Sequence, residues 1–139
     1  MKFNKLIIMA LLLIGQFLST TIAKEHLWFN EEGKFKIVQL TDIHLAESDQ
    51  ADDKTLAVIS TVLKTENPDL VFITGDAVSG YEWNGDEKDF FKSKYSKLTN
   101  LLTEFNVKWA LTAGNHDTEA DLSRFEISEF DWSYPLSMT

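Results

Sequence analysis

Apolar and polar positions along the chain follow two different periods. Short runs rich in aliphatic residues are typical of buried strands, and longer blocks with apolar positions three to four residues apart predict amphipathic helices. The second helical block is the clearest, because Phe91, Tyr95, Leu98 and Leu102 form one stripe. The predicted elements are strands at 35–41, 69–74 and 107–112 and helices at 52–66, 87–105 and about 119–130.

Two further predictions concern the ends of these elements. Trp28 and Phe29 are expected to form a short extra strand before a turn at residues 30–33. Asp49 or Asp52 is expected to cap the first helix, because aspartate accepts hydrogen bonds from the first backbone N–H groups of a helix.

The order β-α-β-α-β predicts an α/β fold. Strands separated by helices of this length run parallel and are joined by right-handed crossovers. The carboxyl ends of parallel strands lie along one edge of the sheet, where ligand sites of such folds form. The residues directly after each strand are therefore the candidates for function.

Polar side chains with metal-binding chemistry follow all three predicted strands. These strand-end motifs are Asp42-Ile43-His44, Gly75-Asp76 and Gly114-Asn115-His116-Asp117. Asp, His and Asn together suit hard or borderline metals, and a cation relieves the repulsion between clustered carboxylates. Each residue also has a structural alternative. Asp42 could be a strand-end turn residue, Asp76 a helix or turn cap, and His44 a partly buried loop histidine. Asn115 could occupy a left-handed turn, and His116 and Asp117 could be a structural pair without catalysis.

Charge and cysteine content exclude several classes of function. The chain has 139 residues, a net charge of −9 and no cysteine. An acidic protein of this kind offers no basic surface to nucleic acid, and a chain without cysteine has neither disulfides nor a thiol nucleophile.

The N-terminal segment has the order of a secretory signal peptide. Lys2 and Lys5 precede an apolar stretch, and small residues lead up to Ala23. We expect a signal peptide at 1–23 and a domain at 24–139, located outside the cell or in a secretory or vacuolar lumen. We expect no stable membrane insertion after cleavage, and a retained signal anchor is the alternative.

The three strand-end motifs together resemble those of the calcineurin-like metallophosphoesterase superfamily. Their flanking residues, as in Leu40-Thr41-Asp42-Ile43-His44 and Thr74-Gly75-Asp76, resemble its purple acid phosphatase-related, Dcr2-like branch over about residues 34–139. The resemblance implies a four-layer α/β/β/α sandwich, of which this chain would be the N-terminal β-α-β-α-β half. It also implies an enzyme that hydrolyses phosphate monoesters at two metal ions, with Fe, Zn and Mn all left open.

The resemblance also assigns roles to residues. The implied metal ligands are Asp42 and His44 for the first metal, Asp76 bridging both, and Asn115 for the second. His116 would stabilise the transition state or protonate the leaving oxygen, and Asp117 would orient His116 by a hydrogen bond. Arg124 is either a contact for substrate phosphate or part of a solvated helix face.

The chain departs from the family pattern at two points. Purple acid phosphatases proper have an iron-binding tyrosine where this chain has Ser79, and Tyr81 is not assumed to replace it. No histidine follows His116, so three further histidine ligands of the family are missing and one sheet face is left uncovered. We therefore expect a truncated sequence, or a short protein whose site is completed by a partner chain. A noncatalytic secreted fragment or binding module is the alternative function.

Overall fold

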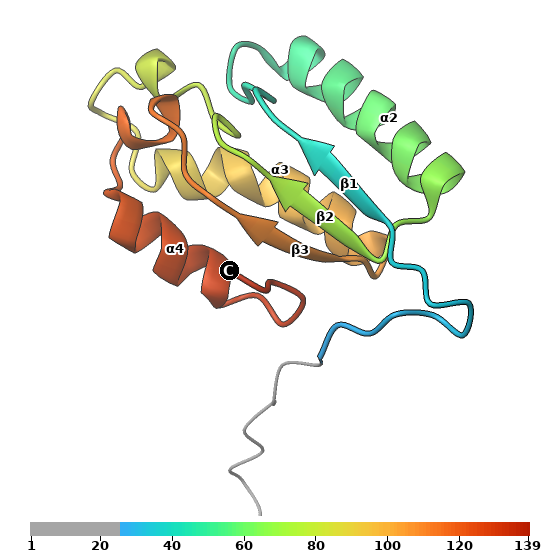
Figure 1. Cartoon of the computed structure of the whole chain (residues 1–139). Coiled ribbons are helices and arrows are strands. Elements are labelled where there is room, and N and C mark those ends of the chain that lie inside the picture. Colours follow the sequence, from blue (N-terminus) through green and yellow to red (C-terminus); the bar gives the residue numbers. More distant parts are fainter. Residues whose placement is uncertain (1–25) are drawn as a thin grey trace, which may run out of the picture.

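A computed structural model describes residues 26–139 and shows a three-stranded parallel sheet with helices around it (Figure 1). The strands are β1 (Ile37–Leu40), β2 (Leu70–Ile73) and β3 (Lys108–Leu111), in the order β1-β2-β3. The helices are α2 (Asp49–Glu66), α3 (Phe90–Glu104) and α4 (Arg124–Trp132), with 3-10 turns η1 (Gly80–Glu82) and η2 (His116–Thr118). The predicted parallel α/β fold is therefore confirmed.

The signal peptide predicted at 1–23 lies outside the described residues. Within residues 26–139, no helix has both the length and the apolar character needed to cross a membrane.

The two faces of the sheet differ in burial. Val71, Ile73 and Trp109 lie on one face and are fully buried in the core, together with side chains of α2 and α3. Ile37 and Phe72 stand on the opposite face, where they are 54% and 39% exposed. The core that positions the strand ends thus lies on the helical side of the sheet.

Helix α2 begins earlier than expected and with a different cap. The Ser48 side chain accepts a hydrogen bond from the Ala51 N–H at 3.2 Å, so the prediction of Asp49 or Asp52 as cap was wrong. Asp52 is buried, and its Oδ1 accepts a hydrogen bond from the Ala46 N–H at 2.9 Å. This aspartate therefore ties α2 to the segment that follows β1.

The aromatic stripe predicted for the second helix packs as expected. Phe91, Tyr95, Leu98 and Leu102 on α3 are fully buried. Helix α4 begins at Arg124, later than predicted, because Ser123 and Glu126 form a capping box there. Residues 119–123, predicted as the start of this helix, form bends and irregular backbone between the turn η2 and α4.

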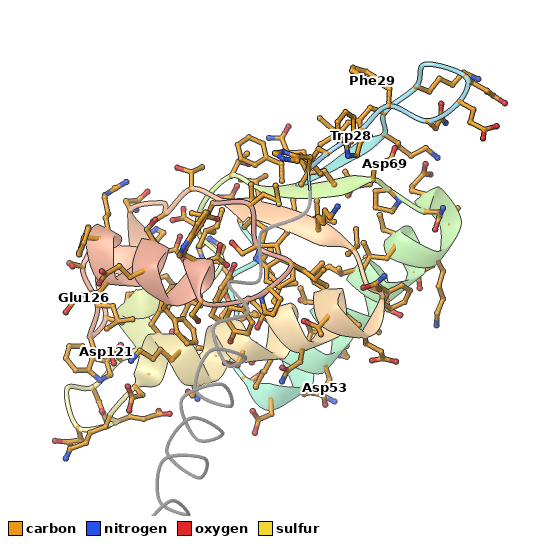
Figure 2. The ribbon with its side chains drawn as sticks, turned by 90° about the horizontal axis from the view of Figure 1, so that it is seen from below. Trp28, Phe29, Asp53, Asp69, Asp121 and Glu126 are labelled. Carbon is orange, nitrogen blue, oxygen red and sulfur yellow. The ribbon has the colours of Figure 1, made fainter. Side chains whose placement is uncertain are left out.

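The strand predicted at Trp28 and Phe29 is not formed. Neither residue belongs to a strand, and their side chains are 75% and 73% exposed in the segment that precedes the turn at residues 30–33 (Figure 2). The turn after them is present, because the Gly33 N–H donates to the Asn30 carbonyl at 2.9 Å.

A buried aspartate on α4 joins three parts of the fold. The Asp131 Oδ1 accepts hydrogen bonds from the Tyr95 hydroxyl and the Trp109 indole N–H, both at 2.7 Å. Its Oδ2 accepts a hydrogen bond from the Ser137 hydroxyl at 2.6 Å and another from Thr139. Burial, followed by the charge of Asp131, holds the pKa of Tyr95 well above its usual value.

Candidate metal centre

Three of the predicted metal ligands meet at the carboxyl ends of β1 and β2. One potential ligand atom from each of Asp42, His44 and Asp76 lies within 4.8 Å of the other two. His44 Nε2 and Asp42 Oδ1 are 4.0 Å apart. Two carboxylates and an imidazole at this spacing are a donor set suited to Zn²⁺, Mn²⁺ or Fe ions.

Backbone hydrogen bonds hold these residues in place beyond the ends of the strands. The Asp42 N–H donates to the Gly75 carbonyl at 3.1 Å, and the His44 N–H donates to the Asp76 carbonyl at 3.0 Å. Leu45 and Val78 then form an isolated parallel bridge. The segments after β1 and β2 therefore continue side by side and present their side chains from a fixed backbone.

All three residues of this cluster adopt left-handed backbone conformations. The φ angles are 51° at Asp42, 53° at His44 and 52° at Asp76. Such angles are uncommon outside glycine and cost of order 1 kcal/mol or more, and they concentrate at functional sites. The surrounding hydrogen bonds keep the residues in this conformation.

The segment after β3 approaches Asp76 closely enough to require a glycine. A Cβ atom placed on Gly114 would lie 2.1 Å from Asp76 Oδ1 and 2.5 Å from its backbone nitrogen. Two residues later, the His116 N–H donates to the same Asp76 Oδ1 at 2.9 Å. Asn115 stands between these two residues in the chain and is exposed.

His116 has a different carboxylate partner from the one expected. Its Nδ1 lies 2.8 Å from Glu119 Oε2, and this hydrogen bond raises the pKa of His116 above its usual value. The Tyr81 ring meets the His116 ring edge-on, with centroids 5.0 Å apart. Sequence reasoning missed Glu119, although residues three apart at the start of a helical turn are natural partners.

Asp117 performs a structural task in place of the predicted hydrogen bond to His116. Its side chain is fully buried, and Oδ2 accepts hydrogen bonds from the backbone N–H groups of Asp76 at 2.9 Å and Gly114 at 2.8 Å. Oδ1 accepts a third from Val78 at 2.9 Å. Burial raises the pKa of Asp117, and the three N–H donors act against that rise. The carboxylate thus joins the segments after β2 and β3.

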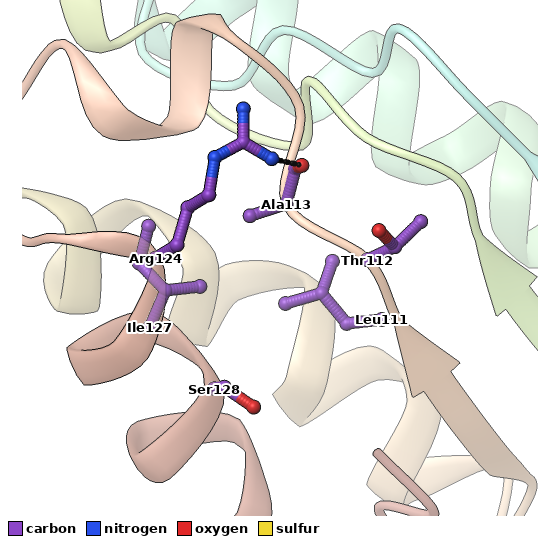
Figure 3. A pocket seen from close by; sticks show the side chains of 6 residues that line it. All are labelled: Leu111, Thr112, Ala113, Arg124, Ile127 and Ser128. Atoms are coloured by element: carbon purple, nitrogen blue, oxygen red, sulfur yellow. Dashed lines mark hydrogen bonds between the residues drawn. The ribbon is translucent and has the colours of Figure 1, made fainter.

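Arg124 lies at the start of α4 and points toward the end of β3 (Figure 3). Its Nη1 donates to the Ala113 carbonyl at 2.8 Å, and the residue borders a half-open hollow of about 220 Å³. It is the only arginine in the sequence. The side chain is therefore anchored beside the third strand end, although none of the three clustered ligands lines this hollow.

Comparison with known proteins points to one family. The profile described as Calcineurin-like phosphoesterase matches residues 35–138, which include all three strand-end motifs. Phosphatase DCR2 of Saccharomyces cerevisiae is 35% identical over 121 residues, which cover 78% of this chain and 20% of DCR2.

Two other proteins show the range of similarity. Probable inactive purple acid phosphatase 29 of Arabidopsis thaliana is 29% identical over 77% of this chain and 30% of its own length. The solved structure of the nuclease MPE of Pseudomonas putida aligns with a TM-score of 0.47 and 21% identity, over 66% of this chain and 44% of that one. The chain thus spans between about a fifth and a third of the length of the curated relatives it matches.

Proposed function

The chain belongs to the calcineurin-like phosphoesterase family, and from this premise we propose that it forms part of a dinuclear metal centre that hydrolyses phosphate monoesters. The observation that carries the proposal is the meeting of Asp42, His44 and Asp76 within 4.8 Å at the carboxyl edge of the sheet. Asp42 and His44 would hold one ion, Asp76 would bridge, and Asn115 would bind the second.

The bound ions would activate a water molecule and neutralise charge on the phosphoryl oxygens. The residues of this chain supply the surroundings for that chemistry. His116 Nδ1 faces the Glu119 carboxylate, which can only accept, so Nδ1 carries a proton. When the ring takes up a second proton, that proton binds at Nε2. Because the pKa of His116 is raised, a larger fraction of the molecules carries protons on both ring nitrogens near neutral pH. His116 Nε2–H can therefore donate a proton to the leaving oxygen.

These four ligands are fewer than two ions require. We propose that protein outside these 139 residues completes the site, either as a continuation of a longer chain or as a partner chain. The size of the curated relatives supports this proposal.

The test is metal-dependent hydrolysis of p-nitrophenyl phosphate by the protein with its site completed, either the longer chain that contains these residues or this chain with its partner, with bound metal measured on the same sample. We expect Asp76→Asn to lower metal content and to reduce turnover by roughly a hundredfold or more. The control is Asp53→Asn, the same change at an exposed position on α2. Normal turnover in the Asp76 variant would contradict the proposal.

A noncatalytic chain with an incomplete metal site is the second candidate. The similarity to a probable inactive purple acid phosphatase favours it. It predicts metal binding that depends on Asp76 without any turnover in excess Mn²⁺, Zn²⁺ or Fe, so the same experiment separates the two candidates.

We also propose that the protein enters the secretory pathway by a signal peptide at residues 1–23. The order of basic, apolar and small residues in that segment supports this proposal. Expression in a secreting host, followed by N-terminal sequencing, should give a mature chain beginning at Lys24. An intact N-terminus would contradict cleavage.

A further inference from the structure

Ser79 is a buried serine whose hydroxyl lies between a candidate metal ligand and a tyrosine. Its Oγ is 3.2 Å from His44 Nδ1 and 3.1 Å from the Tyr81 hydroxyl oxygen. The residue is 0% exposed. A buried hydroxyl must find its hydrogen-bond partners within the protein, so these two contacts satisfy the Ser79 hydroxyl.

The direction of these hydrogen bonds follows from the next contact. The Tyr81 hydroxyl lies 3.4 Å from Glu47 Oε1, and a carboxylate can only accept, so the Tyr81 O–H donates to Glu47. The Tyr81 oxygen then accepts the single proton of the Ser79 hydroxyl. Ser79 has no second proton, so it can only accept from His44.

This direction selects one form of the His44 ring. If Ser79 accepts, then His44 Nδ1 carries the proton and Nε2 of the neutral ring has a free lone pair. Asp42 Oδ1 lies 4.0 Å from Nε2, which is too far for a hydrogen bond that would favour the opposite form. The free Nε2 therefore lies on the side of the carboxylate cluster.

We propose that Ser79 is a positioning residue that holds His44 in its Nδ1–H form, with Nε2 available to a metal ion, and that Tyr81 and Glu47 set the direction of this hydrogen-bond chain. Histidine ligands in metal sites commonly donate their other N–H to an oxygen partner, which orients the ring. The Tyr81 ring adds packing, because its centroid lies 5.0 Å from the His116 ring and 6.1 Å from the His44 ring. The metal-binding part rests on the proposed function, whereas the part about the His44 ring does not.

The first test is ¹⁵N NMR of the imidazole nitrogens in the metal-free chain at about pH 9, where histidine is neutral. We expect His44 to carry its proton on Nδ1. Tyr81→Phe keeps the aromatic ring but frees the Ser79 hydroxyl to donate, so the Nε2–H form of His44 should appear. Ser79→Ala should also mix the two forms.

The matched control is Ser137→Ala, another fully buried serine, whose hydroxyl bonds Asp131 and not His44. This variant should leave the His44 spectrum unchanged. A wild-type His44 that is mainly Nε2–H would overturn the inference, and so would a Tyr81→Phe spectrum identical to wild type. The Tyr81 variant decides the matter if Ser79→Ala does not fold.

The second test is the affinity of the chain for Zn²⁺, measured by calorimetry. We expect Ser79→Ala to weaken binding about 10- to 100-fold, as for other partners of metal-bound histidines. Equal affinity in a folded Ser79→Ala variant would overturn the positioning role. If the wild-type chain binds no Zn²⁺ but keeps the Nδ1–H form, the metal-binding part of the inference, which rests on the proposed function, fails while the hydrogen-bond chain stands.

Discussion

Asp117 and Asp76 lie 41 residues apart in sequence, and the Asp76 backbone N–H donates to Asp117 Oδ2 at 2.9 Å. The same carboxylate also accepts from Val78 and Gly114. One buried side chain therefore holds together the two segments that shape the candidate site.

Asp117→Asn should destabilise the fold by about 1–3 kcal/mol. Asparagine has one acceptor oxygen, so its NH₂ group would face at least one backbone N–H that now has a carboxylate partner. The free energy of unfolding in urea measures the effect, with the exposed Asp53→Asn as control (Figure 2). Equal stability of the two variants would show that the carboxylate is not needed.

Lys97→Ala should destabilise the fold in a pH-dependent way. The Lys97 ammonium lies 2.7 Å from the buried Asp52 carboxylate and 3.1 Å from Asp49. The hydrogen bond with Lys97 lowers the pKa of Asp49 below its usual 3.8. The stability contributed by the pairing of Asp49 with Lys97 is present above the pKa of Asp49 in the unfolded chain. It is lost as pH falls through the lower pKa of Asp49 in the folded chain.

At pH 7 we expect a loss of roughly 1–3 kcal/mol in this variant, because Asp52 stays buried without its cation. Unfolding in urea at several pH values measures it, with the exposed Lys54→Ala as control. The difference from wild type should shrink below about pH 4. A difference that stays constant into acid would argue against these ion pairs.

Asp131→Ala should have the largest effect on stability among these variants. It removes the acceptor of the Tyr95 hydroxyl, the Trp109 N–H and the Ser137 hydroxyl. Each buried donor left without a partner costs about 1–3 kcal/mol, so the sum is roughly 3 kcal/mol or more. Thermal unfolding followed by circular dichroism measures the loss.

The control for Asp131 is Glu129→Ala, an exposed acid on the same helix. This variant should unfold close to the wild-type temperature. If both variants unfold together, the buried hydrogen bonds of Asp131 contribute little.

Gly114→Ala should disturb Asp76 directly. The new methyl group would lie 2.1 Å from Asp76 Oδ1, so the carboxylate or the backbone must move. We expect weaker Zn²⁺ binding together with a lower midpoint of unfolding, measured by calorimetry and urea.

Gly33→Ala separates this clash from backbone strain. Gly33 has a φ of 71° but no atom within 4 Å of an added Cβ, so this variant carries strain alone. It should lose about 1 kcal/mol of stability with no change in Zn²⁺ affinity. Unchanged affinity in Gly114→Ala would mean that the site tolerates movement of Asp76.

Local patterns predicted the order of strands and helices because burial dictates the period of apolar residues. They failed where a partner decides the outcome. Trp28 and Phe29 have strand-forming side chains, but a strand also needs a neighbour to pair with. Ser48, and neither Asp49 nor Asp52, caps α2, because the helix begins about one turn earlier than the apolar stripe suggests.

At the candidate site, too, local patterns were predicted from the sequence and contacts between distant segments were not. The motifs placed Asp42, His44 and Asp76 together because parallel strands end at one edge. They did not predict the partners of those residues, since these depend on how separate loops cross in space. Glu119 replaced Asp117 beside His116, and Ser79 contacts His44 from 35 residues away.

The hydrogen bonds that continue past the ends of β1 and β2 also affect how the site responds to unfolding. The Asp42 and His44 amides are paired to the neighbouring segment as strand amides are. Their hydrogen exchange should therefore be slow, with protection close to that of the sheet rather than that of a surface loop. Asp42 and His44 would then belong to the same cooperative unit as the core, and a metal ion held at the proposed site would be released only when that unit opens.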